Sequence, residues 1–342
     1  MSPRDAGRLR IFLLIVGSSA LIGAIYGFSG NGWNGLVRGF VTGLAISGLI
    51  AGIEIGLDEP IRRQVARYPL WVLLAVRTVG YGLCIVLGSA VGELVVPAPD
   101  IERSLLGMSS RDYVFSFAMA LLLNMVLAIS RLLGPGVLTS FLTGRYHRPR
   151  PEDRIFLILD LRGSTAIAAQ IGNTQFLKLL DDYFIDLARA VLDHGGEVYR
   201  YVGDAMIACW TETRGLRGGA CLRAAIEARR LLAARADHYR REFGIVPGLR
   251  AALHAGPVVS GEIGDIKREI VYLGDGLNLT AKLEMHGKAH DADLIVSADL
   301  LARLGPLPEG VTASALPPLG LSEGRQLDAV AITAPAAPRR RP

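Results

Sequence analysis

The N-terminal part of the chain contains four long apolar stretches that are nearly free of charged residues. They cover residues 10–29, 36–57, 70–96 and 113–134. Each approaches or exceeds the roughly 20 apolar residues that a helix needs to cross a lipid bilayer. From Arg145 onward, apolar and polar positions alternate in shorter runs, which is typical of a soluble domain with helices and strands. The pattern predicts a membrane domain with four transmembrane helices over residues 1–144, followed by a soluble domain.

Positive charges predict how the four spans are oriented. Arginines precede the first span, lie between the second and third, and follow the fourth: Arg4, Arg8, Arg10, Arg62, Arg63, Arg67, Arg131, Arg145, Arg148 and Arg150. The loops near 30–35 and 97–112 are poorer in net positive charge. Because cytoplasmic loops are enriched in Lys and Arg, we expect a multi-pass protein of the cell inner (plasma) membrane with both termini cytoplasmic. Much of the positive charge that gives the net +5 flanks the apolar stretches. The expected partner is therefore a lipid bilayer and not a nucleic acid.

Charged and small residues inside the spans suggest how the helices pack. Glu54, Arg77 and Glu93 are costly in lipid and should face the interior of the bundle. They indicate either a ligand or ion site, or an internal charge pair that fixes the helix register. Glycines recur every fourth residue at Gly23/Gly27, Gly48/Gly52/Gly56 and Gly88/Gly92. This spacing permits close helix contact, either within the bundle or in a dimer.

The soluble half is predicted to begin after a basic linker, residues 145–153, and to form one domain over residues 154–333. Strands are expected at 154–161, 197–202, 205–210, 249–255, 268–273, 294–297 and 325–332, and helices at 165–193, 215–243 and 276–287. The order β-α-β-β-α-β, with additions, predicts an α+β ferredoxin-like sheet covered by helices on one face. Residues 334–342 are expected to be a disordered tail. Three cysteines without metal-ligand spacing indicate a reducing compartment.

Two aspartates follow apolar strands at glycine turns. Asp160 ends the strand before Gly163, and Asp204 lies in the turn of the predicted hairpin. Two carboxylates held by neighbouring strands can bind divalent cations against a polyphosphate, which suggests phosphoryl chemistry on a nucleotide. Gly163, Ser164 and Thr165 open the following helix, where backbone N–H groups suit phosphate binding. Plain N-capping by Ser164 or Thr165 and an ordinary turn aspartate at 204 are the structural alternatives.

Four motifs in order resemble the class III nucleotidyl (adenylate/guanylate) cyclase family, from about residue 152 to 332. They are Phe156-Leu157-Ile158-Leu159-Asp160-Leu161-Arg162-Gly163-Ser164-Thr165, Gly203-Asp204-Ala205-Met206-Ile207-Ala208, Leu253-His254-Ala255-Gly256-Pro257-Val258-Val259-Ser260-Gly261-Glu262-Ile263-Gly264 and Gly274-Asp275-Gly276-Leu277-Asn278-Leu279-Thr280-Ala281-Lys282-Leu283-Glu284. The resemblance, to membrane-anchored bacterial members, implies a class III catalytic domain after the membrane anchor.

The resemblance also implies a reaction. Asp160, Asp204 and the backbone carbonyl of Leu161 would hold two Mg²⁺ or Mn²⁺ ions per active site. The protein would be an adenylate cyclase that converts ATP into 3′,5′-cyclic AMP and pyrophosphate, in intracellular signalling. Asn278 would orient the ribose, and Lys282 occupies the position of the family's transition-state arginine. Because these two groups come from opposite protomers in the family, a homodimer is implied.

Three positions depart from the family pattern. Lys282 keeps the positive charge but lacks the planar guanidinium, so we expect reduced turnover. Arg200 stands where adenylate cyclases usually have a base-selecting lysine, and it can contact a purine or pair with Glu197 or Glu269. Val271 stands where they have an aspartate or threonine, and it cannot hydrogen-bond the base. These positions leave the base open. The resemblance implies ATP, the usual substrate of membrane-anchored bacterial members, with another NTP (GTP or a pyrimidine) and a catalytically weak membrane sensor as alternatives.

Overall fold

The computed structural model describes residues 3–56, 68–96, 110–133 and 137–334. They fall into two compact units, one within Asp5–Leu138 and the other within Thr139–Pro342. Arg62, Arg63 and Arg67, most of the predicted loop 97–112, and the predicted tail after residue 334 lie outside the described residues.

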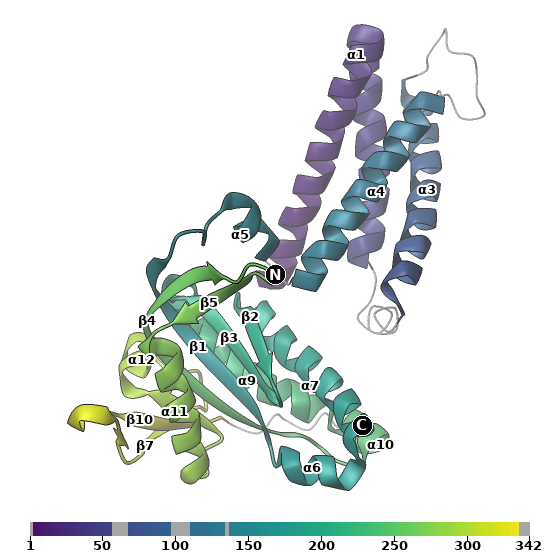
Figure 1. Ribbon diagram of the computed structural model, residues 1–342. Helices are drawn as coiled ribbons and strands as arrows, with labels where there is room; N and C mark the ends of the chain where they lie inside the picture. Colours follow the sequence, from purple (N-terminus) through teal and green to yellow (C-terminus); the bar gives the residue numbers. More distant parts are fainter. Residues whose placement is uncertain (1–2, 57–67, 97–109, 134–136, 335–342) are drawn as a thin grey trace. The chain divides into compact units, whose positions relative to one another are not determined.

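The first unit is made of long apolar helices (Figure 1). They are α1 (Pro3–Gly56), α3 (Leu70–Val95) and α4 (Ser110–Leu133), and the short α5 (Val137–Thr143) follows. Four segments are long and apolar enough to cross a membrane: Phe12–Gly30, Gly32–Ile53, Trp71–Val95 and Ser110–Ser130. The first two are the halves of α1, which reverses direction at Gly32, where φ is +59°. The prediction of four long apolar helical segments is confirmed, with boundaries that differ by a few residues.

The two halves of α1 pack through glycines. A Cβ atom added at Gly23 or Gly27 would collide with the backbone of Gly39 or Gly35 in the other half. In α3, Gly88 and Gly92 lie in the same way against Ile46 and Thr42. These glycines therefore serve packing within the bundle, whereas a Cβ at Gly48 or Gly52 would meet nothing within 4 Å.

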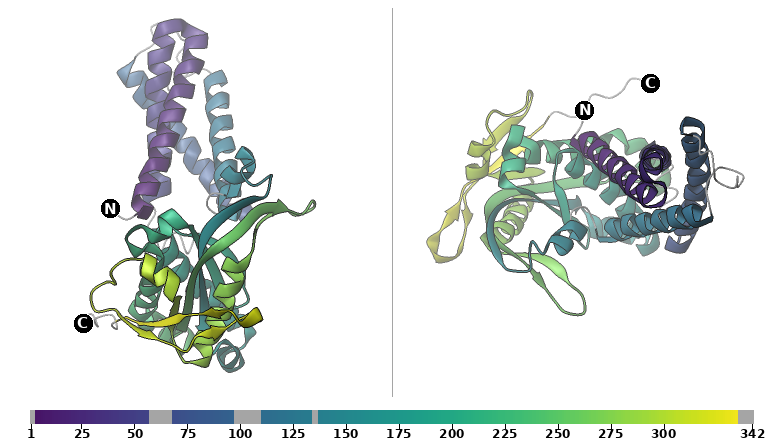
Figure 2. Two further views of the ribbon diagram at one scale, coloured as in Figure 1. Left: turned by 90° about the vertical axis from the view of Figure 1, so that its left-hand side faces the viewer. Right: turned by 90° about the horizontal axis from the view of Figure 1, so that it is seen from above.

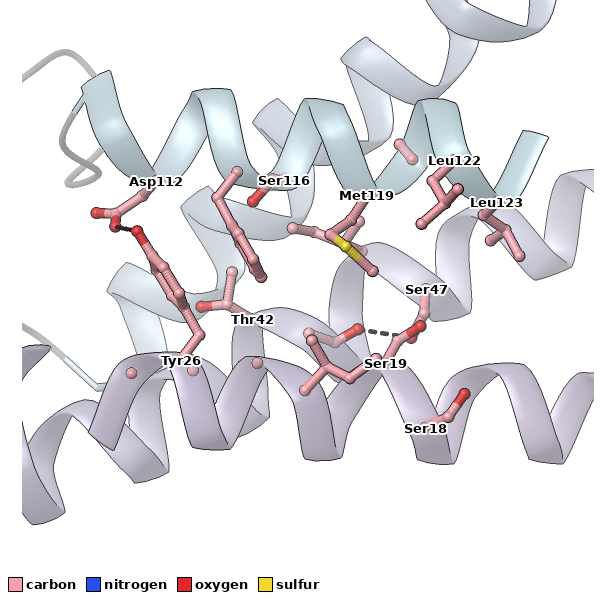
Figure 3. Close-up of a pocket in the computed structure, with 18 of the residues that line it drawn as sticks. Ser18, Ser19, Tyr26, Thr42, Ser47, Asp112, Ser116, Met119, Leu122 and Leu123 are labelled. Carbon is pink, nitrogen blue, oxygen red and sulfur yellow. Dashed lines mark hydrogen bonds between the residues drawn. The ribbon is translucent and has the colours of Figure 1, made fainter. Parts of the chain in front are cut away.

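Several polar groups in this unit are paired or line a cavity. Glu93 forms an ion pair with Arg38, as expected if an internal charge pair fixes the register. The Tyr26 hydroxyl donates a hydrogen bond to Asp112 (3.0 Å), which joins α1 to α4. Beside this bond lies a cavity of about 630 Å³ between the halves of α1 and α4 (Figure 3). Its walls are apolar apart from hydroxyl groups at Ser18, Ser19, Thr42, Ser47 and Ser116 and the polar residues near its end.

The second unit is built on a mixed sheet. Its strands are β1 (Arg150–Arg162), β2 (Glu197–Val202), β3 (Ala205–Thr211), β4 (Gly248–Ile263), β5 (Glu269–Leu273), β6 (Leu294–Ser297), β7 (Thr312–Ala315) and β10 (Ala329–Thr333). The order is β2-β3-β1-β4-β6-β10-β7, and β5 pairs with the end of β4. The β4–β6 pair is parallel and the other pairs are antiparallel. The β4–β5 hairpin extends beyond the rest of the sheet (Figure 2), and β8 (Leu319–Gly320) pairs separately with β9 (Gln326–Leu327).

Two long predicted helices are each divided into shorter ones. The expected helix 165–193 is α6 (Ser164–Ile171) and α7 (Asn173–Asp193), separated at Gly172, where φ is +79°. The expected helix 215–243 is α8 (Glu212–Leu216), a 3₁₀ turn at Arg217–Gly219, α9 (Ala220–Ala234) and α10 (Ala236–Phe243). The remaining helices are α11 (Asp275–Ala289), α12 (Ala298–Arg303) and a 3₁₀ turn at Ser322–Gly324.

Helices cover both faces of the sheet. Leu157 and Leu159 of β1 belong to the main core, which includes residues of α7, α9 and α12. Side chains alternate along a strand, so Phe156 points to the other face, where it packs in a cluster with Leu277 of α11. The prediction of helices on one face only is therefore wrong for α11. This helix matters because it carries predicted site residues.

Candidate active site

The sheet brings Asp160 and Asp204 together at one rim. In the β1–β3 register Asp160 lies opposite Ala205, the residue directly after Asp204. Gly203, with φ of +60°, makes the tight β2–β3 turn that presents Asp204. Burial, followed by the charge of Asp204, raises the pKa of the Asp160 carboxyl group to about 6. The predicted proximity of the two carboxylates, although they are far apart in sequence, is thus present in the structure.

The donor set fits a divalent cation. The two half-buried carboxylates repel each other, and a cation between them would remove that repulsion. Among the described residues, no group of three or more His, Cys, Asp and Glu side chains is arranged to hold a metal. The remaining ligands would therefore be backbone oxygens, for which Leu161 is the prediction, and oxygens of a bound phosphate.

Three residues that the sequence analysis did not select also lie at this rim. Glu284 of α11 raises the pKa of Asp160, and Lys288 on the next turn lowers it. Arg250 of β4 lies directly opposite Asp160 in the β1–β4 register. Burial raises the pKa of Glu284, and the charges of Lys288 and Arg250 partly offset this increase. Oε1 of Glu284 and Nε of Arg250 are buried without a hydrogen-bond partner. Only the strand register relates Arg250 to Asp160, so no local sequence signal could have found it.

Tyr183 of α7 is a further neighbour of the carboxylate pair. Its side chain is fully buried, and its hydroxyl has no hydrogen-bond partner. Burial raises its pKa well above the ordinary value, and the charges of Asp160 and Asp204 raise it further. The negative potential of the two aspartates therefore extends into the core beneath the rim.

The turn after β1 has the geometry of an anion site. Gly163 adopts the left-handed conformation (φ +69°) and directly precedes α6, which begins at Ser164. No side chain caps this helix end, so the predicted capping role of Ser164 or Thr165 is absent. The first backbone N–H groups of α6 are thus available to a ligand close to Asp160.

Asn278 and Lys282 lie on α11 but on a different side from Glu284. Successive residues of an α-helix are about 100° apart, which places Lys282 roughly 160° and Asn278 roughly 120° from Glu284 around the axis. Both residues are exposed. The side of α11 that approaches Asp160 and Asp204 is therefore not the side that carries Asn278 and Lys282.

The two predicted base-selecting positions are on β2 and β5, which pair with β3 and β4 and not with each other. The Arg200 guanidinium of β2 donates to Oε2 of Glu269 on β5 (2.5 Å), which is the pairing alternative named from the sequence. Lys267 contacts the other oxygen of Glu269 (2.5 Å). Val271, two residues further along β5, is 9% exposed and offers no polar group.

Comparison with known proteins identifies the second unit. The model of the adenylate and guanylate cyclase catalytic domain family matches residues 150–307. Residues 150–307 thus match the catalytic domain of the class III cyclases. Adenylate cyclase 2 of Rhizobium meliloti (strain 1021) is 41% identical over 181 residues, which are 53% of this chain and 50% of that protein. An adenylate cyclase of Anabaena cylindrica is 24% identical over 157 residues, 43% of this chain and 30% of the relative.

A solved structure has the same fold. A bacterial light-regulated adenylyl cyclase superposes with a TM-score of 0.54 at 18% identity, covering 68% of this chain and 66% of that one. The cyclase domain thus has a known architecture. The chain spans only about half the length of its Rhizobium relative and less than a third of the Anabaena one.

Proposed function

We propose that this protein is a membrane-bound adenylate cyclase that converts ATP into 3′,5′-cyclic AMP and pyrophosphate. The observation that carries the proposal is the pair of carboxylates, Asp160 and Asp204, at the rim of a class III cyclase domain. The named Rhizobium relative, at 41% identity, supports ATP as the substrate.

The residues at the rim suit each part of the reaction. Two divalent cations, Mg²⁺ or Mn²⁺, would neutralise the triphosphate and make the ribose 3′-hydroxyl more acidic, held by Asp160, Asp204 and the carbonyl of Leu161. The N–H groups at the start of α6 would bind phosphate oxygens. Arg250 adds a positive charge opposite Asp160, which suits the same anionic groups. These contacts would hold the α-phosphorus in line with the 3′-oxygen, so that pyrophosphate leaves as the ring closes.

The active form is a homodimer in which each site takes residues from both chains. Asn278 would orient the ribose, and Lys282 would stabilise the charge on the α-phosphate in the transition state. Their position on α11, turned away from the side that carries Glu284, supports their use in the site of a second copy.

The substrate base is read at Arg200 and Val271. Because Val271 is apolar, Arg200 supplies the polar contact to the base. To do so, its guanidinium must leave Glu269 and bind the base instead. Both termini are proposed to lie in the cytoplasm, at the inner membrane, as the arginine distribution indicates. The site then faces the cellular pool of nucleotides.

The test is a product analysis of the full-length protein in detergent. It is supplied with Mn²⁺ and with ATP, GTP, CTP or UTP separately, and products are identified by mass spectrometry. Cyclic AMP from ATP, absent in Asp204→Ala, is the expected result. A cyclic product from another triphosphate alone would replace ATP as the substrate. If the folded, dimeric protein makes no product from any of the four triphosphates, the proposed cyclase activity is contradicted. That result would favour a catalytically silent membrane sensor.

A further inference from the structure

Tyr146, in the linker before the cyclase domain, is held tightly by the sheet. Its side chain is only 4% exposed, although the residues around it are largely polar. The Tyr146 carbonyl accepts a hydrogen bond from the backbone N–H of Glu262 in β4 (3.0 Å). The Tyr146 hydroxyl accepts one from the Arg154 guanidinium (2.8 Å), and Arg145 lies over the ring (5.3 Å). A linker that served only as a spacer would need none of these contacts.

Arg154 is a buried charge in the middle of the central strand β1. Its side chain is 2% exposed, and its carboxylate neighbours are imperfectly placed. Oε1 of Glu152 lies 3.1 Å from Nε without an aligned hydrogen bond, and Oε2 of Glu152 accepts only a long one from Nη2 (3.4 Å). Glu197 is 3.7 Å from Nη1. A buried charge costs stability unless it is fully paired, so the Tyr146 hydroxyl is a substantial part of what satisfies this guanidinium.

From Arg154, further side-chain contacts reach β5 and β2, the strands that carry the predicted base-reading positions. The Arg154 guanidinium stacks on the ring of Tyr272 in β5 (5.0 Å). Tyr272 in turn packs against Tyr199 of β2, with ring centroids 4.8 Å apart, and its N–H donates to the Tyr199 hydroxyl (3.4 Å). Tyr199 and Tyr272 directly adjoin Arg200 and Val271.

We propose that Tyr146, Arg154, Tyr272 and Tyr199 form a relay that couples the linker to β2 and β5, with Tyr146 and Arg154 as positioning residues for nucleotide binding. The part that concerns the nucleotide rests on the proposed function. The linker follows the last predicted span in the chain, so a displacement of the linker would pull on the Tyr146 hydroxyl. The guanidinium would then lose one partner, shift on the Tyr272 ring and change the spacing of β2 and β5.

The experiment is hydrogen–deuterium exchange of the full-length protein in detergent, comparing wild type with Tyr146→Phe. This variant removes one oxygen atom and keeps the buried ring. Because it leaves a donor of a buried guanidinium unpaired, we expect peptides of β5 and β2 to exchange about 10-fold faster, with β6 and β10 unchanged. In a Tyr272→Leu background the relay is already broken, so Tyr146→Phe should add less than about twofold.

A matched control is Tyr239→Phe, which also removes a buried tyrosine hydroxyl, the donor to Oδ2 of Asp186 (2.7 Å). Its effect should be confined to α7 and α10. In the enzyme assay, Tyr146→Phe should raise KM for the nucleotide several-fold and change kcat less than about twofold. Unchanged exchange in β5, or an increase spread equally over β6 and β10, would overturn the relay. Relay-like exchange in a protein that makes no cyclic nucleotide would refute the proposed function and leave the relay standing.

Discussion

In the absence of metal, replacing Asp160 with asparagine should make the cyclase domain more stable near neutral pH. The fold raises the pKa of Asp160 from 3.8 to about 6, so the folded state binds a proton more tightly than the unfolded chain does. The ionised carboxylate therefore costs stability, and the cost is absent below about pH 4, grows between the two pKa values and is complete above about pH 6. Asparagine removes the charge at nearly the same volume.

The magnitude follows from the pKa shift. A shift of roughly 2 units corresponds to about 3 kcal/mol, and solvent screening of a half-buried group reduces this to about 1–2 kcal/mol. Such a gain slows the exchange of amides that open with the domain by about 5- to 30-fold. The assay is hydrogen–deuterium exchange of β1 and β3 peptides in the full-length protein with a chelator present, comparing the variant with wild type at pH 7.5 and at pH 4.

The expected result is slower exchange of Asp160→Asn at pH 7.5 and no difference at pH 4. Added Mn²⁺ should protect the wild type and have little effect on the variant, because the carboxylate that binds the ion is gone. Asp237→Asn is the control, since that side chain is 83% exposed, and it should change nothing at either pH. Equal stability of Asp160→Asn and wild type at pH 7.5 would refute the inferred cost of burying the ionised Asp160 carboxylate beside Asp204.

Three further predictions concern the chemistry. Lys282→Arg should raise kcat by roughly 3- to 10-fold, because the guanidinium can donate two aligned hydrogen bonds; a fall would show that Lys282 does not serve the transition state. Mixed Asp160→Ala and Asn278→Ala chains should recover about a quarter of wild-type activity, since random pairing makes half of the dimers mixed with one intact site each; inactive verified heterodimers would exclude shared sites. Glu269→Gln should change the KM for ATP less than about fivefold, because its exposed ion pair with Arg200 is weak; a larger change in steady-state kinetics would make Glu269 a direct nucleotide contact.

The sequence was sufficient for the features that local signals encode. Asp160 and Asp204 each follow an apolar strand at a glycine turn, and antiparallel pairing of β1 with β3 brings such ends together. The helix break at Gly172 was missed because the apolar periodicity continues across it and hides the turn. Helix periodicity reports which face is buried but not where one helix stops and another starts.

Strand β4 shows why long-range pairing limits such predictions. Its predicted end at residue 255 lies just before Pro257, which cannot donate a backbone hydrogen bond. The strand continues to Ile263 because its second edge is used in separate parts, by β6 at Ala251–Leu253 and by β5 at Val259–Ile263. Pro257 lies between them, where no N–H is needed on that edge. The approach of Glu284 and Arg250 to Asp160 depends on the same pairing and on the packing of α11, so it too is invisible in the local sequence.

The glycine contacts within α1 have a consequence for natural variation. Every amino-acid substitution of a glycine introduces a Cβ atom, and at Gly23, Gly27 and Gly39 that atom would meet backbone, which cannot move aside as a flexible side chain can. Gly48 and Gly52 have open space around the same atom. In a population of functional variants, or a saturation library selected for membrane insertion, the first three positions should stay invariant while the other two drift. The hairpin would then be recorded as a pattern of forbidden alleles.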